Sequence, residues 1–173
     1  MYEGRISKEL LKRLPKSDLH LHLDGSLRLS TLIELAEADP TIQLPATTES
    51  GLREPVFKER YNDLGEYLQG FAYTCAVLQN AENLTRVARE LAEDNLAEGV
   101  RYIEVRYAPQ LHINEQLSLE QCLLAVDRGL RQAADRFNAQ PAVESGAEPR
   151  FAYGIIACAL RMFNEHTPGW YGR

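Results

Sequence analysis

The chain has 173 residues, of which 45% are hydrophobic and 25% are charged, and its net charge is −6. This composition is ordinary for a globular protein, and the acidic balance argues against nucleic acid or an anionic membrane as the main partner. No apolar run approaches the roughly 20 residues of a membrane-spanning helix. The polar N-terminus and three widely spaced cysteines (Cys75, Cys122 and Cys158) predict a cytoplasmic protein without disulfides.

The first predicted strand covers residues 18–23, where Asp-Leu-His-Leu-His-Leu alternates strictly. Further elements follow in order: a helix over about 31–39, an irregular excursion over 40–60, helices over about 62–79 and 81–98, a strand over 101–107, a helix over about 118–138 and a strand over 151–158. Capping boxes at Thr31 and Ser118 support two of these helices, and Gly99 is a good helix stop.

Strands that alternate with helices predict parallel βα units. An open doubly wound sheet and a (β/α)8 barrel both fit this pattern, but no G-x-G-x-x-G or G-x-x-x-x-G-K turn supports the usual nucleotide-binding form of the open sheet. A barrel needs about 250 residues. We therefore expect residues 1–173 to form one partial domain, with a helical insertion at about 40–98.

A candidate metal motif lies in the first strand. His20 and His22 are two residues apart, so their side chains point to the same face, and Asp24 continues on that face just past the strand. The opposite face, which a layer of helices would cover, carries the leucines of the strand: Leu19, Leu21 and Leu23. Two such histidines are often only polar surface. However, an unpaired imidazole pair inside an apolar strand is costly, and imidazole suits zinc.

Two stretches resemble the adenosine deaminase family: residues 15–26, PKSDLHLHLDGS, and residues 98–109, EGVRYIEVRYAP. The resemblance covers nearly the whole chain, to about Arg161. The zinc motif of cytidine deaminases, H-x-E with P-C-x-x-C, is absent. The resemblance implies an α/β fold, the N-terminal part of a (β/α)8 TIM barrel of the metal-dependent hydrolase type.

The resemblance also implies an activity. In this family a water activated by one Zn²⁺ displaces ammonia from C6 of a purine, here adenosine or deoxyadenosine. By matching positions, His20 and His22 would be zinc ligands, and His22, Asp24 and Gly25 would contact the nucleoside. Asp24 would hydrogen-bond a ribose hydroxyl, and because related free-base deaminases tend to carry Glu there, Asp24 favours a nucleoside.

A second part of the implied substrate site lies in residues 64–71, LGEYLQGF, which resemble the family's helix over the pocket mouth. Leu64, Tyr67 and Phe71 have the spacing i, i+3 and i+7 and would form an apolar lip over the nucleoside. Tyr67 stands where the family usually has Phe. The alternative is ordinary core packing of an amphipathic helix.

Charged residues on the second strand predict a structural ion pair. Glu104 and Arg106 share a strand face with Tyr102, and charges on a covered strand need partners. We expect Arg106 to be largely buried and to contact Asp18 or Glu104.

The family places its third zinc histidine, its proton-shuttling glutamate, another histidine and a pair of aspartates in later strands. We therefore expect no catalytic residue in this chain, no activity of the chain alone, and self-association through unclosed barrel edges. His112 and His166 are expected at the surface or in loops, and Glu165 fits no motif. Two alternatives remain: another amidohydrolase-type zinc hydrolase, or a non-catalytic product that associates with a full-length enzyme.

Overall fold

The computed structural model describes residues 6–160. Three parallel strands form one sheet in the order β1 (Lys16–His22), β2 (Val100–Tyr107) and β3 (Ala152–Ala157). The helices are α1 (Lys8–Arg13), α2 (Leu29–Glu37), α3 (Glu49–Arg53), α4 (Leu64–Val77), α5 (Ala81–Ala97), α6 (Leu119–Asn138) and α7 (Pro141–Glu144), with a 3-10 turn, η1 (Pro109–Leu111). The α/β class and the parallel strands confirm the prediction.

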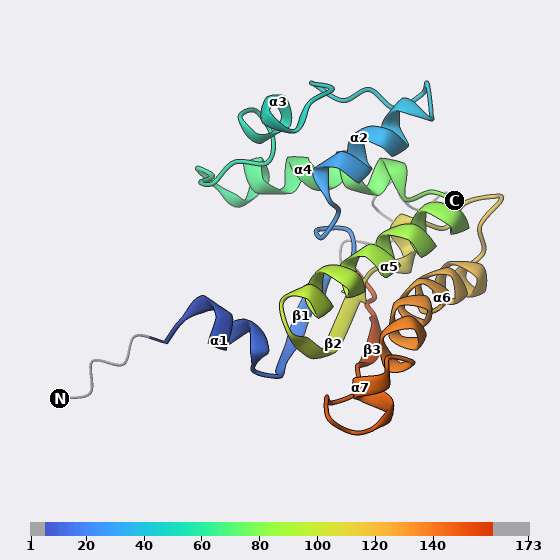
Figure 1. Cartoon of the computed structure of the whole chain (residues 1–173). Helices are drawn as coiled ribbons and strands as arrows, with labels where there is room; N and C mark the ends of the chain where they lie inside the picture. The colour runs from blue at the N-terminus through green and yellow to red at the C-terminus, as the bar shows by residue number, and fades with distance from the viewer. Residues whose placement is uncertain (1–5, 161–173) are drawn as a thin grey trace.

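Helices α5 and α6 lie side by side on one face of the sheet, whereas α2, α3 and α4 form a second group beyond the ends of β1 and β2 (Figure 1). The close contact between α5 and α6 depends on Gly129, because a Cβ there would lie 2.2 Å from the carbonyl oxygen of Thr85. The stretch 40–98, predicted as a helical insertion, holds α3, α4 and α5, of which α5 packs against β2 and α6.

The core lies between the sheet and these two helices. Leu84, Val87 and Leu91 line the buried side of α5, as the helical spacing predicts, and meet Ile103 and Val105 of β2. Each such side chain contributes roughly 1.5–3 kcal/mol of burial free energy. Among the helices of residues 6–160, none combines the length and the apolar character needed to cross a membrane.

Strand β1 departs from strict alternation. Its register pairs Asp18 with Ile103 and Leu21 with Val105, so an advance of three residues along β1 matches an advance of two residues along β2. A bulge of this kind bends the strand and leaves a residue unpaired. The prediction that helices cover the leucines of β1 is right for Leu23, which is fully buried, but wrong for Leu19, which is 53% exposed because it lies in the bulge.

The predicted capping box at the start of α2 is wrong. The helix begins at Leu29 after Arg28, which makes no side-chain cap, and the Thr31 hydroxyl instead donates to Glu90 Oε2 of α5 at 2.6 Å. The capping box at Ser118 is confirmed, with both of its reciprocal hydrogen bonds present. A tertiary partner for Thr31 therefore outweighs the local cap.

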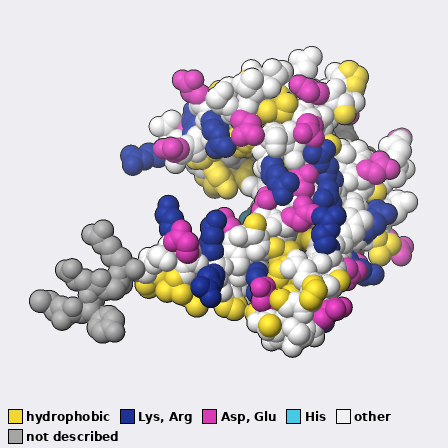
Figure 2. All heavy atoms as spheres, in the orientation of Figure 1, with side chains coloured by type: hydrophobic (Ala, Val, Ile, Leu, Met, Phe, Trp, Pro, Cys, Tyr) yellow, Lys and Arg dark blue, Asp and Glu magenta, His cyan; other side chains and the backbone are white. Residues whose placement is uncertain are grey.

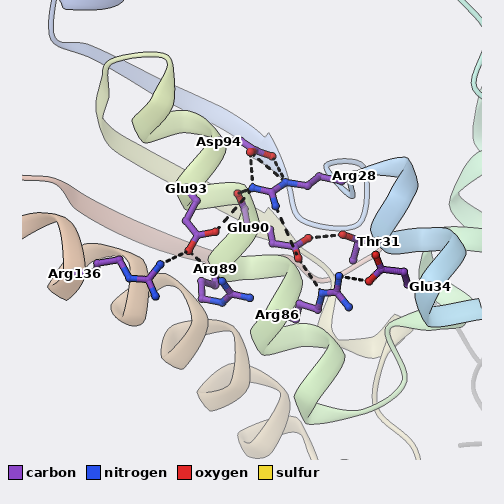
Figure 3. A network of polar contacts seen from close by, with 9 residues as sticks. All are labelled: Arg28, Thr31, Glu34, Arg86, Arg89, Glu90, Glu93, Asp94 and Arg136. Atoms are coloured by element: carbon purple, nitrogen blue, oxygen red, sulfur yellow. Dashed lines mark hydrogen bonds and ion pairs between the residues drawn. The ribbon is translucent and has the colours of Figure 1, made fainter. Parts of the chain in front are cut away.

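Glu90 is the buried centre of a polar network that ties α2 to α5 (Figure 3). Its Oε1 accepts from Arg86 Nε at 2.8 Å, and Arg86 also reaches Glu34 of α2 at 2.5 Å. Arg28 donates three hydrogen bonds to the Asp94 carboxylate, of 2.6, 2.9 and 3.2 Å. Figure 2 shows basic and acidic side chains interleaved on this face of the molecule, so charge here serves to join helices.

His112, expected at the surface or in a loop, lies in a loop but not at the surface. It follows η1 and is fully buried, and its Nδ1 lies 3.1 Å from the carbonyl oxygen of Leu78, to which it can donate. Its Nε2 has no hydrogen-bond partner within residues 6–160. Burial lowers the pKa of His112 to about 4, so the ring is neutral at pH 7. Its contact with Leu78 joins the loop after β2 to the end of α4.

The depressed pKa of His112 predicts an acid-sensitive stability. His112 binds a proton near pH 6.5 in the unfolded chain but only near pH 4 in the folded chain. The stability that the neutral His112 ring contributes is therefore fully present above pH 6.5 and is lost as the pH falls towards 4. Between pH 7.5 and pH 5 the free energy of unfolding should therefore fall by about 2 kcal/mol because of His112. Urea unfolding of the wild type and of His112→Asn at both pH values measures this difference. An equal pH dependence in the two proteins would contradict it.

Candidate metal centre and ligand cavity

The two histidines of β1 lie as the alternation along the strand predicts. The Nε2 atoms of His20 and His22 are 3.2 Å apart and the ring centroids 5.2 Å apart. His22 stands beside Arg106 in the register, on the side of the sheet opposite the buried Val105. Both rings are exposed, so the pair lies on the face that α5 and α6 leave open.

This pair fits a zinc ion. Two nitrogens at about 2.0–2.1 Å from one tetrahedral ion lie about 3.3–3.4 Å apart, close to the observed 3.2 Å. The same distance also suits a hydrogen bond between two imidazoles, one donating and one accepting. Within residues 6–160, no group of three His, Cys, Asp or Glu side chains is placed to hold a metal. The described residues therefore supply two ligands of the three that a catalytic zinc normally takes.

Asp24 lies directly after this pair and is 5% exposed. Its Oδ1 is 4.0 Å from His22 Nδ1 and has no hydrogen-bond partner in the described part of the chain. Its Oδ2 lies 4.0 Å from Cys75 Sγ of α4. Burial raises the pKa of Asp24, although the charge of His22 and the amides of Asp24 and Gly25 oppose the shift. The Asp24 carboxylate is therefore removed from water, and its Oδ1 is free to accept a hydrogen bond.

Asp24 opens into a cavity of about 80 Å³. The cavity is lined by Asp24, Gly25, Leu27, Phe57, Tyr61, Tyr67, Gly70, Phe71 and Thr74. A whole small-molecule site usually measures about 300–1,000 Å³, so this space is a subsite for part of a ligand.

Of the predicted lip, Tyr67 and Phe71 line the cavity, with ring centroids 5.6 Å apart. Leu64 is 70% exposed and does not line it. Sequence reasoning missed Phe57 and Tyr61, which precede α4. The only signal for them was the long irregular segment that carries Phe57, since such segments are often functional.

The predicted ion pair of Arg106 is wrong. Within residues 6–160 Arg106 is half-buried, lies beyond 4 Å of the carboxylates of Asp18 and Glu104, and has no hydrogen-bond partner for Nε. Glu104 instead accepts from the Tyr102 hydroxyl at 3.0 Å. The register pairs Asp18 with Ile103, three residues before Arg106, or about 10 Å along the strand. Glu165 and His166 lie outside the described residues.

Comparison with known proteins identifies the family. The family model described as "Adenosine deaminase" matches residues 15–167, nearly the whole chain. The chain therefore belongs to the adenosine deaminase family, and its sheet and helices are the first units of that family's TIM barrel.

Individual relatives agree with this assignment. The chain is similar to an adenosine deaminase of Clostridium botulinum (strain Loch Maree / Type A3), with 44% identity over 179 residues that cover 92% of this chain and 53% of the relative. It resembles the structure of an Arabidopsis N6-mAMP deaminase, MAPDA, with a TM-score of 0.65 and 27% identity, covering 86% of this chain and 42% of the other. It also resembles the structure of the ADAL–IMP complex, with a TM-score of 0.60 and 30% identity, covering 75% of this chain and 37% of the other. The chain thus spans about half the length of such relatives or less.

The geometry of the two imidazoles predicts zinc binding by both. Removing either His20 or His22 leaves one ligand, so His20→Ala and His22→Ala should each weaken binding at least about tenfold. Histidine resonances of the chain, followed by NMR during zinc titration, measure this effect. Those of His112, which is buried elsewhere, are the internal reference and should not move. Zinc that binds both variants as tightly as the wild type would contradict the assignment.

Proposed function

We propose that this chain forms the first part of the active site of an enzyme that hydrolytically deaminates adenosine or deoxyadenosine to inosine and ammonia. The observation that carries the proposal is the pair of Nε2 atoms 3.2 Å apart at the end of β1, beside a buried carboxylate that lines a cavity. Parallel barrels bind substrates and carry their catalytic residues at this end of the strands. Membership of the adenosine deaminase family supports the same reaction class.

The residues of the site divide between metal binding and ligand binding. His20 and His22 hold the ion, which when bound supplies an activated water for hydrolysis. Asp24 accepts a hydrogen bond from a ribose hydroxyl through its unpartnered Oδ1. Tyr67 and Phe71 cover the apolar side of the ligand. These residues bind and orient, and none of them is assigned the transfer of a proton.

The cavity favours a nucleoside over a nucleotide. The relatives include a deaminase of N6-mAMP and a complex with IMP, both of which are phosphorylated purines. Among the described residues that line the cavity there is one carboxylate and no lysine or arginine. A phosphate placed there would meet a buried negative charge without a cation to offset it. We therefore propose an uncharged purine nucleoside, in line with the 44% identity to an adenosine deaminase.

We expect the 173-residue chain alone to show no measurable adenosine deamination. Two imidazoles bind zinc weakly, and β1 and β3 each have an edge that no other described strand covers. Loss of adenosine absorbance with added zinc tests the activity, and sedimentation tests self-association. Zinc-dependent turnover by a monomer would contradict both expectations. An inactive but monodisperse chain would contradict only self-association and would favour the role of a binding partner for a complete enzyme.

Asp24→Ala should selectively weaken the binding of adenosine. Losing a hydrogen bond to a charged group costs roughly 1.5–3 kcal/mol, or about 10- to 100-fold in affinity. Adenine, which lacks the sugar, should bind the variant and the wild type alike. NMR titration of the zinc-supplemented chain with both ligands measures the difference, and Asp24→Asn is the matched control that keeps the size and removes the charge. An equal loss for adenine would show that Asp24 does not contact the sugar.

A further inference from the structure

The two oxygens of the Asp24 carboxylate have different surroundings. Oδ1 has no hydrogen-bond partner in the described part of the chain, whereas Oδ2 lies 4.0 Å from the sulfur of Cys75, within the range of a thiol hydrogen bond. Asp24 lines the cavity and is 95% buried, so water does not satisfy its oxygens freely. A buried carboxylate with one engaged and one unengaged oxygen has a defined direction in which to accept a further donor.

Helix geometry brings Cys75 to this carboxylate. Tyr67, Phe71 and Thr74 line the cavity from α4, and Cys75 follows Phe71 at i+4 on the same face of the helix. Cys75 is 7% exposed. It comes from a segment 51 residues away from Asp24 and places a side-chain donor 4.0 Å from Oδ2.

The thiol is in the donor form. A cysteine thiol is ordinarily protonated below about pH 8.5, and burial raises the pKa of Cys75 to about 12. The S–H group has a single proton to donate, and a carboxylate accepts only. The direction of the contact is therefore fixed, from sulfur to Oδ2.

We propose that Cys75 is a positioning residue whose thiol holds Oδ2 of Asp24 and so presents Oδ1 to a hydroxyl group of the ligand. The inference rests on the proposed function, because it concerns how Asp24 selects a ligand with a sugar over a free base. Cys75 itself does not contact the ligand in this scheme. Its role is to restrict rotation of the carboxylate about its Cβ–Cγ bond.

Two replacements separate donation from packing. Cys75→Val removes the donor and keeps the bulk, whereas Cys75→Ser keeps a donor and reduces the bulk. Affinities of the zinc-supplemented chain for adenosine and adenine are measured by NMR titration. We expect Cys75→Val to weaken adenosine binding about 3- to 10-fold, the scale of one modest hydrogen bond, and to leave adenine unchanged. Cys75→Ser should retain at least part of the preference for adenosine.

Cys122 provides the matched control. It is a fully buried cysteine on α6 that does not line the cavity, so Cys122→Val makes the same chemical change away from Asp24. This control should leave the affinities for both ligands unchanged. An equal loss of both ligands in Cys75→Val would mean that Cys75 only packs and would overturn the proposal.

The S–H stretching band gives a readout that needs no ligand. The infrared difference spectrum between the wild type and Cys75→Val isolates the band of this thiol. Asp24→Ala should shift that band to higher frequency, because a free thiol vibrates at higher frequency than a donating one. An unshifted band together with intact adenosine binding would overturn the positioning role alone. A preference for adenosine over adenine that Asp24→Ala leaves unchanged would overturn the proposed contact of Asp24 with the sugar and, with it, the presentation of Oδ1.

Discussion

The parallel pairing of β1 with β2 is the constraint on which the site depends. It aligns His22 with Arg106, and the amide of Leu23 donates to the carbonyl of Arg106 at 3.0 Å, which extends the pairing one residue past the strand. This bond fixes the start of the turn that carries Asp24. Because the backbone is held on both sides of the bulge, the two imidazoles and the carboxylate reach the same end of the sheet with little freedom.

The second anchor lies between α2 and α5. Glu90 is buried and accepts hydrogen bonds from Thr31 of α2 and from Arg86 of its own helix. Arg28, which precedes α2, donates to Asp94 of α5. The turn with Asp24 is therefore tied at one end to β2 and at the other to α5. A buried carboxylate with two or more donors is strongly directional, and losing one partner would leave an uncompensated charge. The site thus gains its rigidity from contacts outside it.

Local signals in the sequence predicted much of this arrangement, and tertiary contacts account for the rest. Alternation placed the imidazoles of β1 on one face, and the box at Ser118 predicted the start of α6, because both depend on neighbouring residues only. Thr31 could not be predicted, since its partner lies 59 residues away. His112 is a loop residue, but its burial could not be predicted because it comes from a contact with the end of α4. The ion pair of Arg106 failed because the strand register, which the alternating pattern does not specify, sets Asp18 opposite Ile103, three residues before Arg106.

The unsatisfied polar groups on the side of the histidines follow the same logic. Asp24 Oδ1 and Arg106 Nε are buried without hydrogen-bond partners among residues 6–160, and both lie next to His22, one in the chain and one in the register. Elsewhere the network around Glu90 leaves no such group on its carboxylate. Other buried side-chain atoms of the described residues also lack partners, His112 Nε2 among them, but only beside the two exposed imidazoles do a negative acceptor and a positive donor stay open together. The acceptor, Asp24 Oδ1, is the atom that a hydroxyl group of a ligand would use, so its open position supports the task proposed for Asp24.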